Sequence, residues 1–548
     1  MPHSKDSTLR IWLLPFLILL TAALTLLVTT FWVDSGSPLG ALQQLGALFF
    51  PAPAAAANTL GNAGEIVAAV LAIALTVVAI VVELASNRYT HRVTELFVSE
   101  PINFVVMSLF VVTAVQALWV TMSIQAGGSE PGIPYFSVGV TMLLLTVCLL
   151  ILLPYFSFVF AFLNPVKIVD RICNHTLEVI AKPSRRRSLL QRKLEVIRGL
   201  EQLADVAVNS MEHRDKGVSM ASVHALRQLL SSYQALRPAL PEAWYELDEA
   251  LVQNPDFVSM DERVLSDVVA RRVWFEMKVL RQYQTIYVEA LPRMRDICYV
   301  VAIDTRLAAE SAHARGDVEL LHLCMKFFNT YVRAAINAKD VRTAYNVFNQ
   351  YRLLAEALID ADDGGYAVEI ARYFKYYGLL ANAAELPFVL ETAAYDLCSL
   401  AELAFHRSST ALSDLLRIVL SVDREGDGAE HEQGLRGVRK AQVKLAAIFL
   451  EEGGTDLARE IYLDMASEDR SRLALIRDEL SLVLAPEYWE IIDRGSNFDY
   501  LPPGQRRCLT TFFAWFEGLP QERQAFSSAV PSAPGQSAAG PDPKHDGS

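Results

Sequence analysis

The chain has 548 residues, of which 52% are hydrophobic, and it carries a formal net charge of −13. Its one basic block, residues 165–200, holds 9 Lys and Arg against 3 Asp and Glu, whereas residues 201–548 hold 36 against 52. An acidic chain whose positive charge gathers in one short block does not favour nucleic acid as a partner.

Four apolar segments lie in the first 164 residues, at about 11–33, 66–85, 102–122 and 136–163. Each is long enough to cross a hydrocarbon core, which needs about 20 apolar residues. The sequence therefore predicts a membrane domain over residues 1–164 with four transmembrane helices. The first segment is too long for the apolar part of a cleaved signal peptide, so we expect it to stay as an anchor.

The charges between these segments predict their orientation. Residues 34–64 and 123–135 contain no Lys or Arg, which is typical of extracytoplasmic loops. Basic residues flank the opposite ends of the helices, at Lys5, Arg10, Arg88 and Arg92 and in the block that follows residue 164. We therefore expect both termini to lie in the cytoplasm.

Polar residues in or near the apolar segments form a candidate membrane cluster. Glu83, Asn87 and His91 would share one face at the cytoplasmic end of the second helix if that helix continues, and Gln116 lies well inside the third. One hypothesis is a proton- or ion-responsive cluster. The alternatives are a hydrated helix end that pairs with nearby arginines, and ordinary hydrogen bonding between helices for Gln116.

The basic segment 165–200 follows the membrane domain, and its apolar residues recur at helical spacing. It therefore predicts a juxtamembrane helix at the bilayer surface or packed on its neighbours. Its candidate contacts to anionic lipid headgroups are Arg185, Arg186, Arg187, Arg192 and Lys193. The alternative is a positive-inside anchor that recognises nothing specific.

Residues 201–520 keep an apolar period near 3.6, which predicts an all-α cytoplasmic domain. Short polar breaks separate the expected helices, at Gly316-Asp317, Lys339-Asp340, 362–365, 426–428 and Gly453-Gly454. Residues 441–465 look like a tetratricopeptide helix pair, but no 34-residue register holds across the domain. A solenoid-like array and an irregular helical bundle both stay open. Residues 521–548, rich in Pro, Ser, Ala and Gly, are expected to be disordered.

The exit of the second membrane helix resembles a bacterial family of predicted membrane proteins of unknown function. In that family the helix ends in Gln-Leu-Ala-Ser, followed by an aromatic residue, Ser or Thr, and Pro-Arg. The matching positions here are Leu84, Ala85, Ser86, Tyr89, Thr90 and Arg92. Glu83 stands in place of the Gln and His91 in place of the Pro.

A second likeness to this family covers residues 203–230, although residues 213–217 replace the family's Asn-Asp-Pro turn. Together the two cover about the first 240 residues. Because the family has no established activity, the resemblance implies a multi-pass protein of the bacterial inner membrane and no mechanism.

The sequence contains no phosphate-binding loop, no HExxH pair and no GxSxG element. Its six cysteines are scattered without a CxxC pair, which indicates neither a disulfide framework nor a zinc site. We therefore expect no metal and no cofactor, and an enzyme whose site is built from distant residues ranks third, behind two non-catalytic hypotheses. The leading hypothesis is a scaffold or membrane-state sensor that binds a protein partner, and the alternative is an oligomeric ion channel or transporter gated by the cytoplasmic domain.

Overall fold

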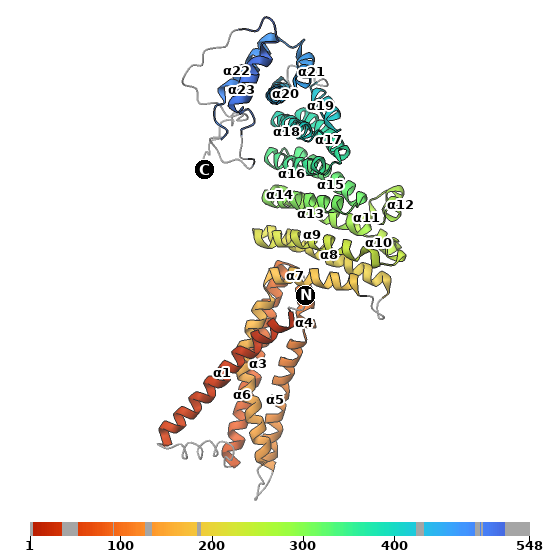
Figure 1. Cartoon of the computed structure of the whole chain (residues 1–548). Coiled ribbons are helices and arrows are strands. Elements are labelled where there is room, and N and C mark those ends of the chain that lie inside the picture. Colours follow the sequence, from red (N-terminus) through yellow and green to blue (C-terminus); the bar gives the residue numbers. More distant parts are fainter. Residues whose placement is uncertain are drawn as a thin grey trace, which may run out of the picture. The chain divides into compact units, whose positions relative to one another are not determined.

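The computed structural model describes residues 4–35, 53–90, 92–126, 134–182, 188–423, 432–487, 494 and 497–520. The chain divides into two compact units, Met1–Asn174 and His175–Ser548, called unit 1 and unit 2 below. Among the described residues all regular structure is helical, which confirms the all-α prediction (Figure 1). The predicted disordered tail, 521–548, lies outside the described residues.

Unit 1 contains four long apolar helices. They are α1 (Ser4–Ser35), α3 (Pro53–Arg88), α5 (Pro101–Ala126) and α6 (Tyr135–Phe162), with the short α4 (Arg92–Ser99) between α3 and α5. All four long helices have the length and composition needed to cross a membrane. Large apolar side chains such as Ile73, Phe104 and Phe136 are exposed on them, by 66%, 77% and 85%. Such an outward apolar surface suits contact with lipid.

Helix α3 begins at Pro53, well before the predicted start at residue 66. The extra turns pack inside unit 1, where Ala57 and Leu60 belong to one buried cluster with Val120 of α5 and Val138 of α6. These first turns contain the alanine run of residues 54–57. They form helix because alanine has the highest helix propensity. A Cβ on Gly64 would lie 3.1 Å from the Cβ of Ala117, so the small residues let α3 and α5 approach closely.

Unit 2 is a stack of helices that follows the end of unit 1, with the boundary inside α7 (Pro165–Ala181). The long helices of the stack are α8 (Leu189–Glu212), α9 (Lys216–Leu236), α13 (Trp274–Arg293), α14 (Arg295–Ala314), α15 (Val318–Asn337), α16 (Val341–Asp360), α17 (Gly364–Ala383), α18 (Pro387–His406), α19 (Leu412–Leu420) and α20 (Glu432–Glu451). Three short helices, α10 (Glu249–Val252), α11 (Pro255–Val258) and α12 (Glu262–Ala270), connect α9 to α13, and α21 (Thr455–Met465), α22 (Arg470–Leu482) and α23 (Pro503–Phe513) end the unit.

These helices form two layers, because each packs against the next helix and the next but one (Figure 1). The first layer consists of α9, α14, α16, α18 and α20, and the second of α8, α13, α15, α17 and α19. Of the two predicted alternatives, this arrangement is the solenoid-like one.

The turns of the stack repeat one backbone motif. Eight residues with φ between 51° and 86° end helices or helical turns: Arg214, Arg272, Gly316, Lys339, Asp362, Glu385, Ser408 and Gly453. Each donates its N–H to the carbonyl three residues earlier, and the following residue donates to the carbonyl five residues earlier. This is the Schellman pattern, which satisfies the last carbonyls of a helix. From Gly316 to Ser408 the motif recurs every 23 residues, so a helix pair takes 46 residues rather than the 34 of a tetratricopeptide repeat.

An aspartate at several turns also starts the next helix. Asp215, Asp317 and Asp340 each accept the backbone N–H of the third residue after them, at 3.3, 3.2 and 3.1 Å. Such N-caps satisfy donors that the first turn of a helix leaves free. The predicted breaks at Gly316-Asp317, Lys339-Asp340, 362–365 and Gly453-Gly454 are confirmed, and residues 426–428 lie outside the described residues.

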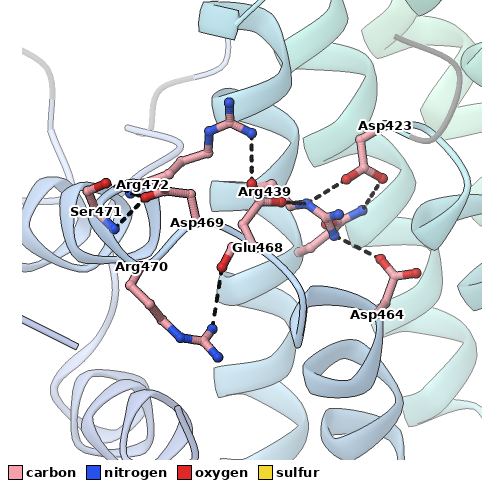
Figure 2. A network of polar contacts seen from close by, with 9 residues as sticks. Asp423, Arg439, Asp464, Glu468, Asp469, Arg470, Ser471 and Arg472 are labelled. Carbon is pink, nitrogen blue, oxygen red and sulfur yellow. Dashed lines mark hydrogen bonds and ion pairs between the residues drawn. The ribbon is translucent and has the colours of Figure 1, made fainter. Parts of the chain in front are cut away.

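A buried ion-pair network fixes the end of the stack (Figure 2). Arg439 of α20 contacts three carboxylates, with Nε 2.5 Å from Asp423, Nη1 2.8 Å from Asp464 and Nε 3.3 Å from Glu468. All four side chains are at most 13% exposed. Because these carboxylates follow α19 or belong to α21 and the turn after it, one guanidinium ties three elements to α20.

Candidate functional site

Two members of the predicted membrane cluster, Glu83 and Asn87, lie on the same helix in the structure. Glu83 and Asn87 are exposed on the last turns of α3, on one face because they are four residues apart. Gln116 is half-buried on α5, and no hydrogen bond between described side chains joins it to Glu83 or Asn87. His91 lies outside the described residues. The ion-responsive role therefore stays a hypothesis about Glu83, Asn87 and His91.

Other polar groups in unit 1 are buried and bonded to one another. Tyr155 Oη donates to Asn103 Oδ1 at 3.3 Å, and Asn103 Nδ2 donates to the carbonyl of Phe97. The Cys148 thiol lies 3.3 Å from Thr113 Oγ1, linking α6 to α5. Because polar groups in hydrocarbon must find partners inside the protein, these pairs hold the helices together. Periodicity alone does not show which polar residues face one another.

Two of the predicted lipid contacts are buried in unit 2. Arg192 is 7% exposed and donates to the carbonyls of Val179 and Ile180 at 3.1 and 2.9 Å, which caps the end of α7. Lys193 is 1% exposed and donates to the Glu246 carbonyl and to Asp248. Both cations are satisfied by protein groups, so we no longer assign them to lipid headgroups. Arg185, Arg186 and Arg187 lie outside the described residues.

A groove on the first layer of unit 2 is the candidate site that sequence reasoning missed. It is formed by α16, α18 and α20, and residues 494 and 497–501 pack against it. We call these residues the strap and the surface beneath them the strap groove. The strap lies between α22 and α23 and contains no helix among its described residues.

At one end of the groove, Arg494 of the strap forms a two-bond ion pair with Asp396 of α18. Its Nη2 also donates to the Tyr345 carbonyl at 2.7 Å, and its guanidinium carbon lies 4.2 Å from the centre of the Tyr345 ring. Arg494 is 6% exposed and Asp396 3%. A planar guanidinium suits such combined carboxylate and aromatic contact, which lysine cannot reproduce.

Next to Arg494, whose guanidinium carbon lies 5.8 Å from the centre of the Phe498 ring, the strap presents an aromatic ring and a carboxylate. Phe498 stacks on Tyr395 of α18 with ring centres 4.8 Å apart, and its carbonyl accepts from Lys444 of α20 at 2.8 Å. Asp499 accepts from the Tyr395 hydroxyl at 2.5 Å and from Lys440 at 2.8 Å. The groove thus offers a carboxylate to Arg494 and ammonium groups to the Phe498 carbonyl and to Asp499.

Burial shifts the pKa values of the groove's ionisable groups. Burial raises the pKa of Glu402 and lowers that of Lys444, so both charges are disfavoured there. Burial alone would also lower the pKa of Lys440, but Glu391 and Asp499 outweigh it and raise that pKa. Lys440 therefore stays charged and able to hold a carboxylate.

A polar cavity of about 260 Å³ lies beside the strap. Its walls include Arg352, Cys398, Glu402, Lys444, Arg494 and Phe498. Arg494 Nε, although buried, has no hydrogen-bond partner among the described residues. Among those residues no group of three or more His, Cys, Asp or Glu side chains is placed to hold a metal ion. The site suits binding of polar and aromatic groups.

Comparison with known proteins concerns mainly unit 1. Residues 8–218 match the family described as predicted membrane protein (DUF2254). This match confirms the resemblance inferred from the exit of the second membrane helix, and it ends at the start of α9. None of the curated proteins and none of the solved structures matches the chain. The strap groove lies beyond the matched residues.

Proposed function

We propose that this protein is a membrane-anchored scaffold whose helical stack binds a protein partner and performs no catalysis of its own. The observation that carries the proposal is the strap groove, where the stack holds a segment without helix, turned at residues 497–500, through side-chain contacts. Stacked helix pairs present continuous surfaces suited to recognition. A sensor role fits the same design, since a membrane unit and a binding unit share one chain.

We also propose that the stack lies in the cytoplasm of a bacterial cell. The support is the distribution of Lys and Arg, which avoids residues 34–64 and 123–135 and concentrates after α6. The same proposal includes contacts from Arg185, Arg186 and Arg187 to the anionic lipid headgroups of the inner leaflet.

The alternative, a gated channel or transporter, needs several copies of the chain. The polar pairs inside unit 1, Asn103 with Tyr155 and Thr113 with Cys148, satisfy one another rather than line a path. Native mass spectrometry of the full-length protein in mild detergent gives the subunit count. A monomer removes the channel, whereas a ring of three or more copies with ion flux in vesicles replaces the scaffold.

Photo-crosslinking in native membranes tests the scaffold directly. A photoreactive amino acid is placed in the full-length protein at Ser399 and Glu402 beside the strap groove, at the exposed Tyr376 and Leu463 elsewhere on the stack, and at the lipid-facing Phe104 as a control. The scaffold predicts one reproducible protein adduct from at least one stack position and none from Phe104. Absence of a defined adduct from every stack position would overturn it.

A further inference from the structure

We propose that the strap groove recognises a linear segment of a partner protein that carries an arginine followed, four and five residues later, by an aromatic residue and an aspartate. The strap occupies the groove as an internal competitor for that segment. This inference rests on the proposed scaffold function and names the partner chemistry and the regulation of its binding surface.

The contacts of the strap are those of a bound peptide. Arg494 contacts Asp396 and the Tyr345 carbonyl across 98 and 149 residues of sequence, and Asp499 contacts Tyr395 across 104. Recognition depends on one arginine, one aromatic ring and one carboxylate held by helix side chains. Buried arginine and aromatic anchors typically dominate the binding energy of protein interfaces.

The charges of the groove fix the direction in which a segment can lie. Asp396 holds the arginine, and Lys440 holds the aspartate with Nζ also 3.1 Å from Glu391. A reversed segment would place its arginine beside Lys440 and its aspartate beside Asp396, and it would lose both of the ion pairs that the strap makes. The groove therefore selects an order of residues as well as their types.

The groove is incompletely filled by the strap. The cavity of about 260 Å³ remains between α16, α18, α20 and the strap, and Arg494 Nε finds no partner among the described residues. A partner segment with a larger polar side chain beside its arginine could fill this space and gain contacts that the strap lacks. That difference gives a partner a means to compete with the strap.

Competition is needed because the strap is attached to the groove it occupies. A segment tethered by a short linker has an effective concentration in the millimolar range, so a free segment of equal affinity binds poorly. Leu501, fully buried, and α23, packed on α20, anchor the end of the strap. Release of Arg494, Phe498 and Asp499 therefore does not require α23 to leave.

A peptide-binding experiment with the full-length protein in lipid nanodiscs tests this inference. The probe is a fluorescently labelled synthetic peptide of residues 491–502, followed by anisotropy. The strap variant Arg494→Ala/Phe498→Ala should bind the peptide at least tenfold more tightly than the wild type. A third change, Asp396→Asn, should weaken that binding at least tenfold, and a scrambled peptide should not bind.

A control variant distinguishes release of the strap from a general effect of substitutions in unit 2. Leu482→Ala/Leu484→Ala changes exposed residues outside the strap and should leave peptide binding at the wild-type level. If the alanine strap variant is misfolded by circular dichroism, Arg494→Gln/Phe498→Leu takes its place.

Equal binding to wild type and strap variant, or binding that ignores Asp396→Asn, overturns the inference. Peptide binding without any photo-crosslinked partner would contradict the scaffold function alone. A crosslinked partner without peptide binding would contradict the groove's recognition rule alone.

Discussion

Arg494 and Asp396, 98 residues apart in sequence, form a buried ion pair that joins the strap to the middle of the helical stack. Removing one partner of such a pair leaves the other charge buried without compensation. Arg352 Nε also lies 3.4 Å from Asp396, so this carboxylate serves two guanidinium groups.

Asp396→Asn should therefore lower the free energy of unfolding by about 3 kcal/mol. Urea unfolding of the detergent-solubilised protein, followed by tryptophan fluorescence, measures the change. Arg494→Met should cost less, and the double variant should cost less than the sum of the two. Additive effects would mean that the two side chains are not coupled.

Arg439→Met should destabilise unit 2 by about 3 kcal/mol or more, because Asp423, Asp464 and Glu468 would face one another without their shared cation (Figure 2). The matched control is Arg417→Met, since Arg417 is 77% exposed and its pair with Asp414 should contribute little. Urea midpoints compare the two. Similar shifts for both variants would contradict the importance of burial.

Glu276 should make stability depend on pH. Burial raises its pKa from 4.5 to about 7, against the opposing influence of Arg237 and the hydrogen bond from Gln234. Because the folded-state pKa is the higher one, folding favours the protonated acid. This contribution is fully present below about pH 4.5 and is lost as pH rises through 7.

Glu276→Gln, which mimics the protonated acid, should therefore match the wild type at pH 4.5 and be more stable at pH 8 by about 1 to 3 kcal/mol. Urea midpoints at both pH values test this. The exposed Glu249→Gln is the control and should show no such trend. A stability difference for Glu276→Gln that stays constant with pH contradicts the prediction.

Ser408→Gly should stabilise the stack, because Ser408 is exposed and has a φ of 51°, a left-handed conformation that glycine adopts without cost. The expected gain is about 0.5 to 1 kcal/mol. Gly453→Ala, at the equivalent turn with a φ of 86°, should destabilise by a similar amount or more. The thermal unfolding midpoints of the two variants measure these changes in stability. Changes of the same sign would contradict the role of the left-handed conformation.

The orientation of unit 1 can be tested by cysteine labelling in spheroplasts. Ser129→Cys, combined with Cys508→Ser, should react with a membrane-impermeant maleimide before lysis, because residues 123–135 are expected outside. The wild-type Cys508 is half-exposed in unit 2, whereas the other five cysteines are buried, so it should react only after lysis. Reversal of the two patterns would invert the topology.

Local sequence patterns predicted that the chain is helical. They did not predict the constant spacing of the turns between the helices. The breaks at Gly316-Asp317 and Gly453-Gly454 were predictable because glycine supplies the left-handed turn. The equivalent turns at Glu385 and Ser408 were not, because these residues carry no such signal. The 23-residue period therefore stayed hidden although the backbone repeats it closely.

Burial of charge was the second source of error. Arg192 and Lys193 lie in a basic run beside the membrane, where solvent exposure is the usual expectation. Their burial depends on carbonyls at the end of α7 and at Glu246, which the sequence does not place nearby. The strap groove was equally hidden, because it joins residues that lie about 100 to 150 positions apart.

The constant spacing of the turns makes the stack modular in length. Consecutive helices run in opposite directions, so a cut of 23 residues would reverse the path of everything after it, whereas a cut of 46 would preserve it. Removing residues 317–362 would join Gly316 to Asp363 at equivalent positions and bring α17 to the place of α15. Since each helix depends mainly on near neighbours, chains of this design can lengthen or shorten by whole helix pairs while the two ends keep their form.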